Sequence, residues 1–278
     1  LIVCSLFFIK QLNYMLDTDP GYRTKDIIKV WFQRPTSSMS YTVEEIKHQE
    51  DANKYILETL QSSPVFETSC FGISPYEFPL NPINKKKVRI PEGQWEEVIH
   101  ITVSPDFLKL YDIPISGKDL PVAENEVLLN ETAKRLFSKN GKLPEQLEDE
   151  RSAKGTSLLV KGFTGDFQTV HLSQNNEPVI LSIHNESPFS QNKLMAAISP
   201  GHRQEAIRFL KKLHGEVGQG DFEYTFVADE IEELYNKDKL AAIIYTVFAL
   251  IAILISSLGL FGLSLFDVQQ RYREIAIR

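Results

Sequence analysis

The side chains most able to bind a metal or move a proton in this sequence are six histidines: His48, His100, His171, His184, His202 and His214. None of them belongs to a His-Glu-x-x-His motif, and neither cysteine completes a Cys/His set with metal-ligand spacing. The two cysteines, Cys4 and Cys70, are also too few for a disulfide framework. The sequence therefore predicts no structural metal, no cofactor and no zinc-dependent chemistry.

Other catalytic patterns are equally scarce. Residues 162–166, Gly-Phe-Thr-Gly-Asp, contain two glycines, but they lack the lysine and the following helix of a phosphate-binding loop. They predict a tight turn between strands. No Gly-x-Ser-x-Gly elbow is present for a serine hydrolase, and the acidic run 145–150 lacks the alternation of a calcium loop. We therefore expect that the chain is not an enzyme.

The most informative element is an apolar segment over residues 241–266, where 26 consecutive residues include no charged side chain. As a helix it would reach about 39 Å, enough to cross a hydrocarbon core of about 30 Å with some tilt. A buried core helix is the alternative, but such helices are usually shorter and keep a polar edge. The segment predicts a transmembrane helix.

The residues around this span indicate its orientation. Residues 267–278 contain three arginines, and arginine beside a span marks the cytoplasmic side. Residues 1–16 begin with only nine uncharged residues before Lys10, so we expect the C-terminal half of a second transmembrane helix and a chain that is a piece of a larger membrane protein. The net charge of −7 leaves no basic stripe for nucleic acid. The basic run 85–89 predicts a solvated loop edge.

Helix and strand signals alternate over residues 17–228, which predicts an extracytoplasmic α+β domain of mixed type, with two lobes, flanked by transmembrane α-helices. The stretch 74–91 predicts an irregular excursion, and the polar residues 139–156 predict a long loop or a partner-facing flap. Residues 193–227 read as strand, helix and strand, the pattern of a split βαβ unit. Residues 229–240 predict an amphipathic stalk helix that continues into the span. Strands are expected near residues 26–32, 65–72, 95–103, 126–129, 158–163, 178–184, 193–198 and 222–227, and helices near 42–60, 104–111, 130–137 and 203–214.

Small residues inside the span predict where it packs on other helices. Ala252 and Ser256 are four residues apart on one face, and Gly259 and Gly262 follow one turn on. Small side chains let helices approach closely in lipid, where packing drives association. Ordinary glycine and serine usage in membrane helices is the alternative. In either case we expect the span to pack on sibling transmembrane helices.

Three segments occur in an order that resembles the MacB-like periplasmic core domain: Ser104-Pro105-Asp106-Phe107, then residues 126–131 (Glu-Val-Leu-Leu-Asn-Glu), then residues 160–167 (Val-Lys-Gly-Phe-Thr-Gly-Asp-Phe). Residues 258–264 and 270–278 resemble the FtsX-type permease domain. Residues 12–16 and 19–22 are similar to the start of the second ectodomain in Bacteroidetes-type permeases that carry two such halves. The resemblance to an ABC permease of the MacB/FtsX type covers nearly the whole chain.

This resemblance implies a function that the residue patterns alone do not give. Such permeases pair with a separate cytoplasmic ABC ATPase, and they form dimers or carry a second permease half. ATP binding moves their membrane helices, and the ectodomain transmits force to a periplasmic or outer-membrane partner. The implied location is the bacterial inner membrane, with several spans and residues 17–240 in the periplasm. The segment implied to contact the ATPase is Arg273, Glu274, Ile275, Ala276, Ile277 and Arg278, with alanine at 276 where the family more often has glycine.

Two other functions fit the same layout. A transmembrane sensor would also place a ligand-binding ectodomain between two helices, although its linker would continue as a heptad-patterned helix rather than end in Arg-Glu-Ile-Ala-Ile-Arg. A regulator of cell-wall hydrolases, as FtsX itself is, would share the ATPase and differ only in its periplasmic partner.

Overall fold

The computed structural model describes residues 2–32, 43–117, 123, 125–138, 144–150, 157–172, 174–184 and 193–277. The chain forms two compact units. One contains Leu1–Thr18 and Glu232–Arg278, and the other contains Asp19–Ile231. The first unit is helical, and the second contains both β-sheets.

The first sheet of the Asp19–Ile231 unit has four antiparallel strands in the order β11-β1-β10-β2. They are β1 (Ile27–Trp31), β2 (Phe66–Phe71), β10 (Lys193–Ile198) and β11 (Glu223–Phe226). Helix α2 (Val43–Gln61) connects β1 to β2, and helix α5 (Arg203–Val217) connects β10 to β11. Each connection passes over one intervening strand. The predicted split βαβ unit at 193–227 is therefore confirmed, and a second one, β1-α2-β2, completes a ferredoxin-like arrangement.

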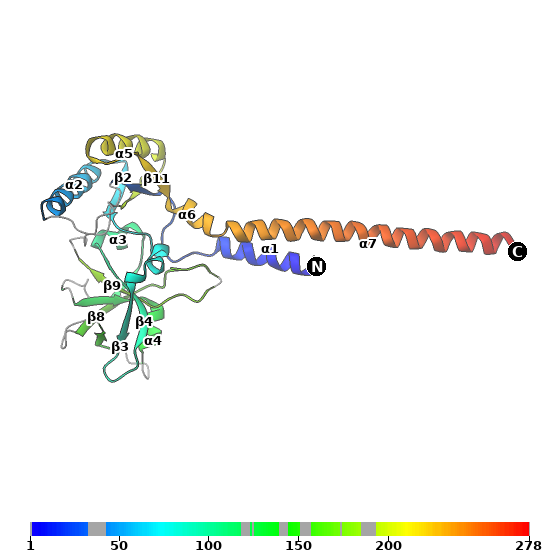
Figure 1. The fold of residues 1–278 in the computed structure, drawn as a ribbon, viewed down its shortest axis with the longest axis horizontal. Coiled ribbons are helices and arrows are strands. Elements are labelled where there is room, and N and C mark those ends of the chain that lie inside the picture. Colours follow the sequence, from blue (N-terminus) through cyan, green and yellow to red (C-terminus); the bar gives the residue numbers. More distant parts are fainter. Residues whose placement is uncertain are drawn as a thin grey trace. The chain divides into compact units, whose positions relative to one another are not determined.

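Alternation along the strands gives this sheet two buried faces. Ile28 and Val30 of β1 join Leu194 of β10 in a core under α2 and α5, the two helices that lie on the same side of the sheet (Figure 1). Ile27 and Met195 point to the other face and join a second core. Because side chains alternate along a strand, Lys29 shares that second face, opposite the helices.

The second lobe is inserted between β2 and β10 and contains a mixed seven-stranded sheet in the order β5-β8-β6-β9-β4-β3-β7. An additional pairing of β7 with β8 closes six of these strands, all except β5, into a small barrel. Its own core includes Val127, Leu129, Leu147 and Ile180. The strands are β3 (Lys85–Arg89), β4 (Glu96–Val103), β5 (Ile115–Gly117), β6 (Glu126–Leu129), β7 (Gln146–Asp149), β8 (Ser157–Thr164) and β9 (Val179–Ile183).

Three parts of this lobe differ from the sequence-based expectation. The basic run 85–89 is not a loop edge but strand β3, with Val88 buried. Part of the predicted loop 139–156 is strand β7, which pairs with β3 and β8 because Leu147 enters the barrel core. Gly162 lies inside β8 rather than in a turn. The rest of the predicted excursion before β3 forms two short 3₁₀ helices, η1 (Pro75–Leu80) and η2 (Pro82–Asn84).

Two short helices begin where the sequence predicts helix starts. Helix α4 (Glu131–Phe137) is capped by Asn130, whose side chain accepts a hydrogen bond from the Ala133 N–H. Helix α3 (Pro105–Leu110) follows Ser104, but the Ser104 side chain makes no capping hydrogen bond. The Phe107 N–H bonds to the Ser104 carbonyl instead.

The helical unit contains α1 (Ile2–Asp17) and the long helix α7 (Asn236–Ile277). Within the described residues, one helix is long and apolar enough to cross a membrane, over Asn236–Arg271, and it contains the predicted span 241–266. The predicted stalk over 229–240 is not a single helix, because α6 (Val227–Leu234) ends before Tyr235 and α7 begins after it. The part from Asn236 onward does continue into the span without a break.

Candidate functional site

The segments that resemble the MacB-like periplasmic core domain, together with residues 19–22, meet in one place, which we call the motif joint and define by Gly21, Phe107, Asn130, Asp166 and Phe167. Asn130 is fully buried at its centre. Its side-chain oxygen accepts hydrogen bonds from the N–H groups of Ala133 at 2.8 Å and Val179 at 2.9 Å. Its amide nitrogen donates to the Glu177 carbonyl at 3.1 Å. One side chain therefore ties helix α4 to strand β9 and to the residues before it.

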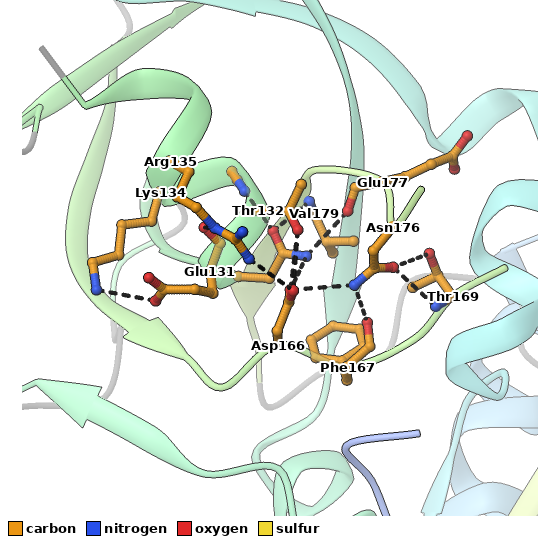
Figure 2. A network of polar contacts seen from close by, with 12 residues as sticks. Glu131, Thr132, Lys134, Arg135, Asp166, Phe167, Thr169, Asn176, Glu177 and Val179 are labelled. Atoms are coloured by element: carbon orange, nitrogen blue, oxygen red, sulfur yellow. Dashed lines mark hydrogen bonds and ion pairs between the residues drawn. The ribbon is translucent and has the colours of Figure 1, made fainter. Parts of the chain in front are cut away.

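Asp166 is the acidic partner in the same joint. Its carboxylate accepts hydrogen bonds from the side chains of Asn130, Thr132 and Asn176, each at 3.2 Å (Figure 2). It also forms an ion pair with Arg135 at 3.3 Å. These donors come from the start of α4 and from the segment before β9. With four partners, Asp166 holds these segments together and is occupied as a hydrogen-bond acceptor.

The N-terminal motif at 19–22 reaches the same joint through backbone contacts. The Gln168 N–H donates to the Pro20 carbonyl at 2.7 Å. Gly21 has a φ of +80°, and a Cβ there would lie 2.2 Å from the Asp166 carbonyl oxygen. Only glycine satisfies both the positive φ and this close approach. The glycine of this motif is therefore explained by the fold.

Aromatic side chains fill the interior beside the joint. The rings of Phe107 and Tyr111 are 4.8 Å apart, and Tyr22 meets Tyr111 edge-on at 5.7 Å. Phe78 of η1 contacts both Phe107 and Phe167. Each of these rings is buried. The interior beside the motif joint is thus packed with buried aromatic rings.

A second polar group, the buried charge cluster, consists of Lys29, Tyr76, Glu77, Lys193 and Glu230. Sequence reasoning missed it, because its members come from β1, η1, β10 and α6. Lys29 is only 2% exposed and forms ion pairs with Glu230 at 2.5 Å and with Glu77 at 3.5 Å. Lys193 pairs with Glu77 at 2.6 Å. Two lysines and two glutamates give the cluster a balanced charge.

The ionisation of this cluster follows from its contacts. Burial by itself raises the pKa of Glu77, but the charges of Lys29 and Lys193 outweigh burial and lower that pKa below its ordinary value. Burial, together with the hydrogen bond that Tyr76 donates to Glu230, raises the pKa of Tyr76. The phenol therefore stays protonated and serves as a donor. These are properties of an ionic junction rather than of a general acid or base.

Other candidate chemical groups are held in unreactive states. Burial raises the pKa of Cys70 to about 12, so its thiol is not a nucleophile at neutral pH. Among the residues that the model describes, no group of three or more His, Cys, Asp or Glu side chains could hold a metal ion.

His100 of β4 is another group that its surroundings hold in one ionisation state, and it gives a prediction about pH. Its Nδ1 lies 3.2 Å from the Lys86 ammonium and its Nε2 lies 2.8 Å from the Ser182 hydroxyl. Lysine only donates, so Nδ1 accepts and the neutral ring donates from Nε2. Burial, reinforced by the Lys86 charge, lowers the pKa of His100 to about 4.

A histidine whose folded-state pKa lies below its ordinary value of about 6.5 contributes stability above pH 6.5, and this contribution is lost as the pH falls toward 4. We expect the free energy of unfolding to be about 2 kcal/mol smaller at pH 5 than at pH 7 on account of His100 alone. Urea unfolding of the full chain at both pH values measures this. His100→Gln should remove most of the difference, whereas His48→Gln, at an exposed position of α2, should leave it. An unchanged pH dependence in His100→Gln would disprove the assignment.

The structure places the sequence-predicted membrane residues along one helix. Ala252 is half-buried and Ser256 is exposed in α7, while a Cβ added at Gly259 or Gly262 would meet no atom within 4 Å. Nothing in the described part of this chain packs on the two glycines, so their role in helix packing stays a prediction. Arg273, Glu274, Ile275, Ala276 and Ile277 continue α7, and Arg278 lies outside the described residues.

The buried positions of helix α7 differ from the four small residues that the sequence predicts as packing positions. Ala242 and Ala249 are buried, seven residues apart and hence on one face. Helix α1 packs along this part of α7, where the rings of Phe8 and Tyr245 are 5.5 Å apart. Ser256 continues the same seven-residue spacing. The heptad spacing of small residues was the signal that could have identified this face.

Comparison with known proteins gives structural matches only. No protein-family model matches the chain, and no curated protein matches it. The fold is similar to the periplasmic region of MacB from Actinobacillus actinomycetemcomitans, with 11% identity, 80% of this chain and 98% of that chain covered, and a TM-score of 0.47. It is also similar to the extracellular domain of the noncanonic ABC-type transporter YknZ from Gram-positive bacteria. That match has 10% identity and a TM-score of 0.43, and it covers 72% of this chain and 99% of that chain.

A third similar structure is a domain of a candidate permease protein from Porphyromonas gingivalis, with 16% identity, coverage of 73% and 90%, and a TM-score of 0.42. In each of the three cases the similarity is one of fold.

Proposed function

We propose that this chain is part of a membrane permease subunit of a MacB/FtsX-type ABC transporter, and that it transmits ATP-driven movement of its membrane helices to a periplasmic domain. The observation that carries the proposal is the continuity of α7, one helix from Asn236 to Ile277 that includes both the apolar span and the segment resembling the ATPase-coupling element. A stiff helix of this length, about 63 Å, can carry a displacement across a membrane.

The proposal gives each part of the chain a place. Residues 267–278 lie in the cytoplasm, because they contain three arginines and arginine beside a span favours the cytoplasmic side. Residues 17–240 lie in the periplasm of a bacterial inner-membrane protein. Arg273, Glu274, Ile275, Ala276, Ile277 and Arg278 form the contact with a cytoplasmic ABC ATPase. Ile275 and Ala276 enter a groove on the ATPase, and the charged residues set the register.

The remaining partners follow from the same function. Ala252, Ser256, Gly259 and Gly262 face sibling transmembrane helices or a second permease half, where small side chains permit close approach. The periplasmic domain acts on a periplasmic or outer-membrane partner. The chain itself has no catalytic role, and the ATPase subunit hydrolyses ATP.

Affinity purification of the intact protein from native membranes, followed by mass spectrometry of the proteins that accompany it, tests the proposal. We expect a stoichiometric P-loop ATPase. A kinase module on the same polypeptide with no ATPase alongside would overturn the proposal in favour of a sensor. A co-purifying cell-wall hydrolase in addition to the ATPase would assign the mechanical output to hydrolase control.

A further inference from the structure

Lys29 occupies an unusual position for a charged side chain. It lies in the middle of β1, opposite Met195 of β10 on one side and Thr225 of β11 on the other. Its side chain is 2% exposed, and burying an ammonium group is unfavourable unless ionic and polar partners compensate for the lost water. Its compensation comes from Glu230, Glu77 and the Tyr76 hydroxyl, the last at 3.2 Å.

The two glutamates depend on Lys29 to different degrees. Glu77 has a second lysine, Lys193, at 2.6 Å, and it accepts a hydrogen bond from the Ser74 N–H at 2.9 Å. Glu230 is also hydrogen-bonded, by the Thr225 hydroxyl at 2.7 Å and by Tyr76, but both of those donors are neutral. Within the described residues, Lys29 is the only cation paired with Glu230.

Because of this asymmetry, the charge of Lys29 is compensated both with Glu230 in place and with Glu230 withdrawn. In the structure Lys29 contacts both carboxylates. If the first turn of α6 withdrew and took Glu230 with it, Lys29 would still have Glu77, Tyr76 and the face of the Trp31 ring, 5.1 Å away. Glu230, already partly exposed, would gain water. Removing one partner from an isolated buried ion pair leaves the other charge buried and uncompensated. In this cluster the loss of Glu230 leaves Lys29 with its other partners.

We infer that Lys29 is a positioning residue that holds the first turn of α6 on the sheet through a releasable ion pair with Glu230. The chain leaves the sheet through this turn, and only residues 231–235 separate Glu230 from α7. Val227 and Ile231 add apolar contacts to the same attachment. Its use as the point where movement of α7 is passed to the sheet rests on the proposed function, whereas the ion pair itself can be tested without any ATPase.

Hydrogen exchange of the full chain in lipid nanodiscs, followed by mass spectrometry, tests the inference. In Glu230→Gln we expect amides of residues 227–234 to exchange at least tenfold faster, while β9 stays protected. Glu77→Gln is the matched control, since it alters a carboxylate of the same cluster but leaves Lys29 paired with Glu230. It should change exchange in 227–234 less than threefold.

A second variant covers the case in which Glu230→Gln unfolds the whole domain. Thr225→Ala removes a support of Glu230 without changing any charge, and it should accelerate exchange in 227–234 by a smaller factor while β9 is unaffected. The inference is overturned if α6 stays fully protected in a folded Glu230→Gln protein, or if Glu77→Gln exposes α6 equally. These outcomes are independent of ATPase capture, so the failure of this inference and that of the proposed function are distinguishable.

Discussion

Replacing Asn130 by alanine is expected to reduce the free energy of unfolding of the Asp19–Ile231 unit by about 3 kcal/mol, because several effects combine at one buried position. The substitution removes the cap of α4, which is worth about 1 kcal/mol. It also leaves the Val179 N–H and the Glu177 carbonyl without the partners that Asn130 provides, and a buried polar group without a partner costs about 1–3 kcal/mol.

Urea unfolding of the full chain in detergent measures this effect. Both tryptophans, Trp31 and Trp95, lie in the Asp19–Ile231 unit, so their fluorescence reports on that unit. Asn81→Ala is the matched control, since Asn81 caps the short helix η2 from an exposed position and should cost less than about 1 kcal/mol. Equal losses in the two variants would show that the motif joint is not the structural centre described above.

Under the proposed function, reversing the charges of Arg273 and Glu274 is expected to abolish most ATPase binding. The double variant Arg273→Glu/Glu274→Arg should weaken capture of the co-purifying ATPase about tenfold or more, because the complementary charges that set the register then oppose their partners. The Asp19–Ile231 unit should stay folded, because the two substituted residues lie near the C-terminal end of α7. Quantitative pull-down from native membranes measures the captured ATPase.

A matched charge reversal in the other unit serves as the control for that experiment. Arg203 and Asp229 form an exposed ion pair at 3.9 Å, and Arg203→Asp/Asp229→Arg should leave capture unchanged. If the 273/274 variant captured as much ATPase as the unaltered chain, the assignment of this segment to ATPase binding would be wrong.

Local sequence patterns predicted much of the fold because their structural causes are local. The strand, helix and strand at 193–227 form a split βαβ unit as expected, since their alternation and capping depend on neighbouring residues. The same is true of the Asn130 cap and of the apolar span in α7.

The expectations that failed depend on partners far along the chain. The run 85–89 forms a strand because it pairs with β4 and β7 and buries Val88. Carboxylates of other segments compensate its charges: Lys85 pairs with Glu97 and Glu177, and Arg89 pairs with Glu148. No pattern within the run indicates those partners. The sequence of strand β7 predicts a loop, because a single buried leucine gives too weak a periodic pattern to indicate a strand.

The buried charge cluster could not be predicted from the sequence, because its members also come from segments far apart in the chain. A lysine within a β-rich run ordinarily marks a solvent-exposed face, and nothing near Lys29 in the sequence indicates Glu77 or Glu230 as its partners. The break at Tyr235 was equally hidden, because the residues on both sides favour a helix. Tertiary contacts, rather than local propensity, determine the charge cluster.

The proposed function requires that ATP binding in the cytoplasm moves the Asp19–Ile231 unit through α7 and α6. Hydrogen exchange at residues 227–234 in the permease–ATPase complex, with and without a non-hydrolysable ATP analogue, tests it most directly. The account predicts that the analogue changes exchange in this segment by at least threefold while β9 stays constant. Identical exchange in both states, with the ATPase bound and occupied, would contradict the account.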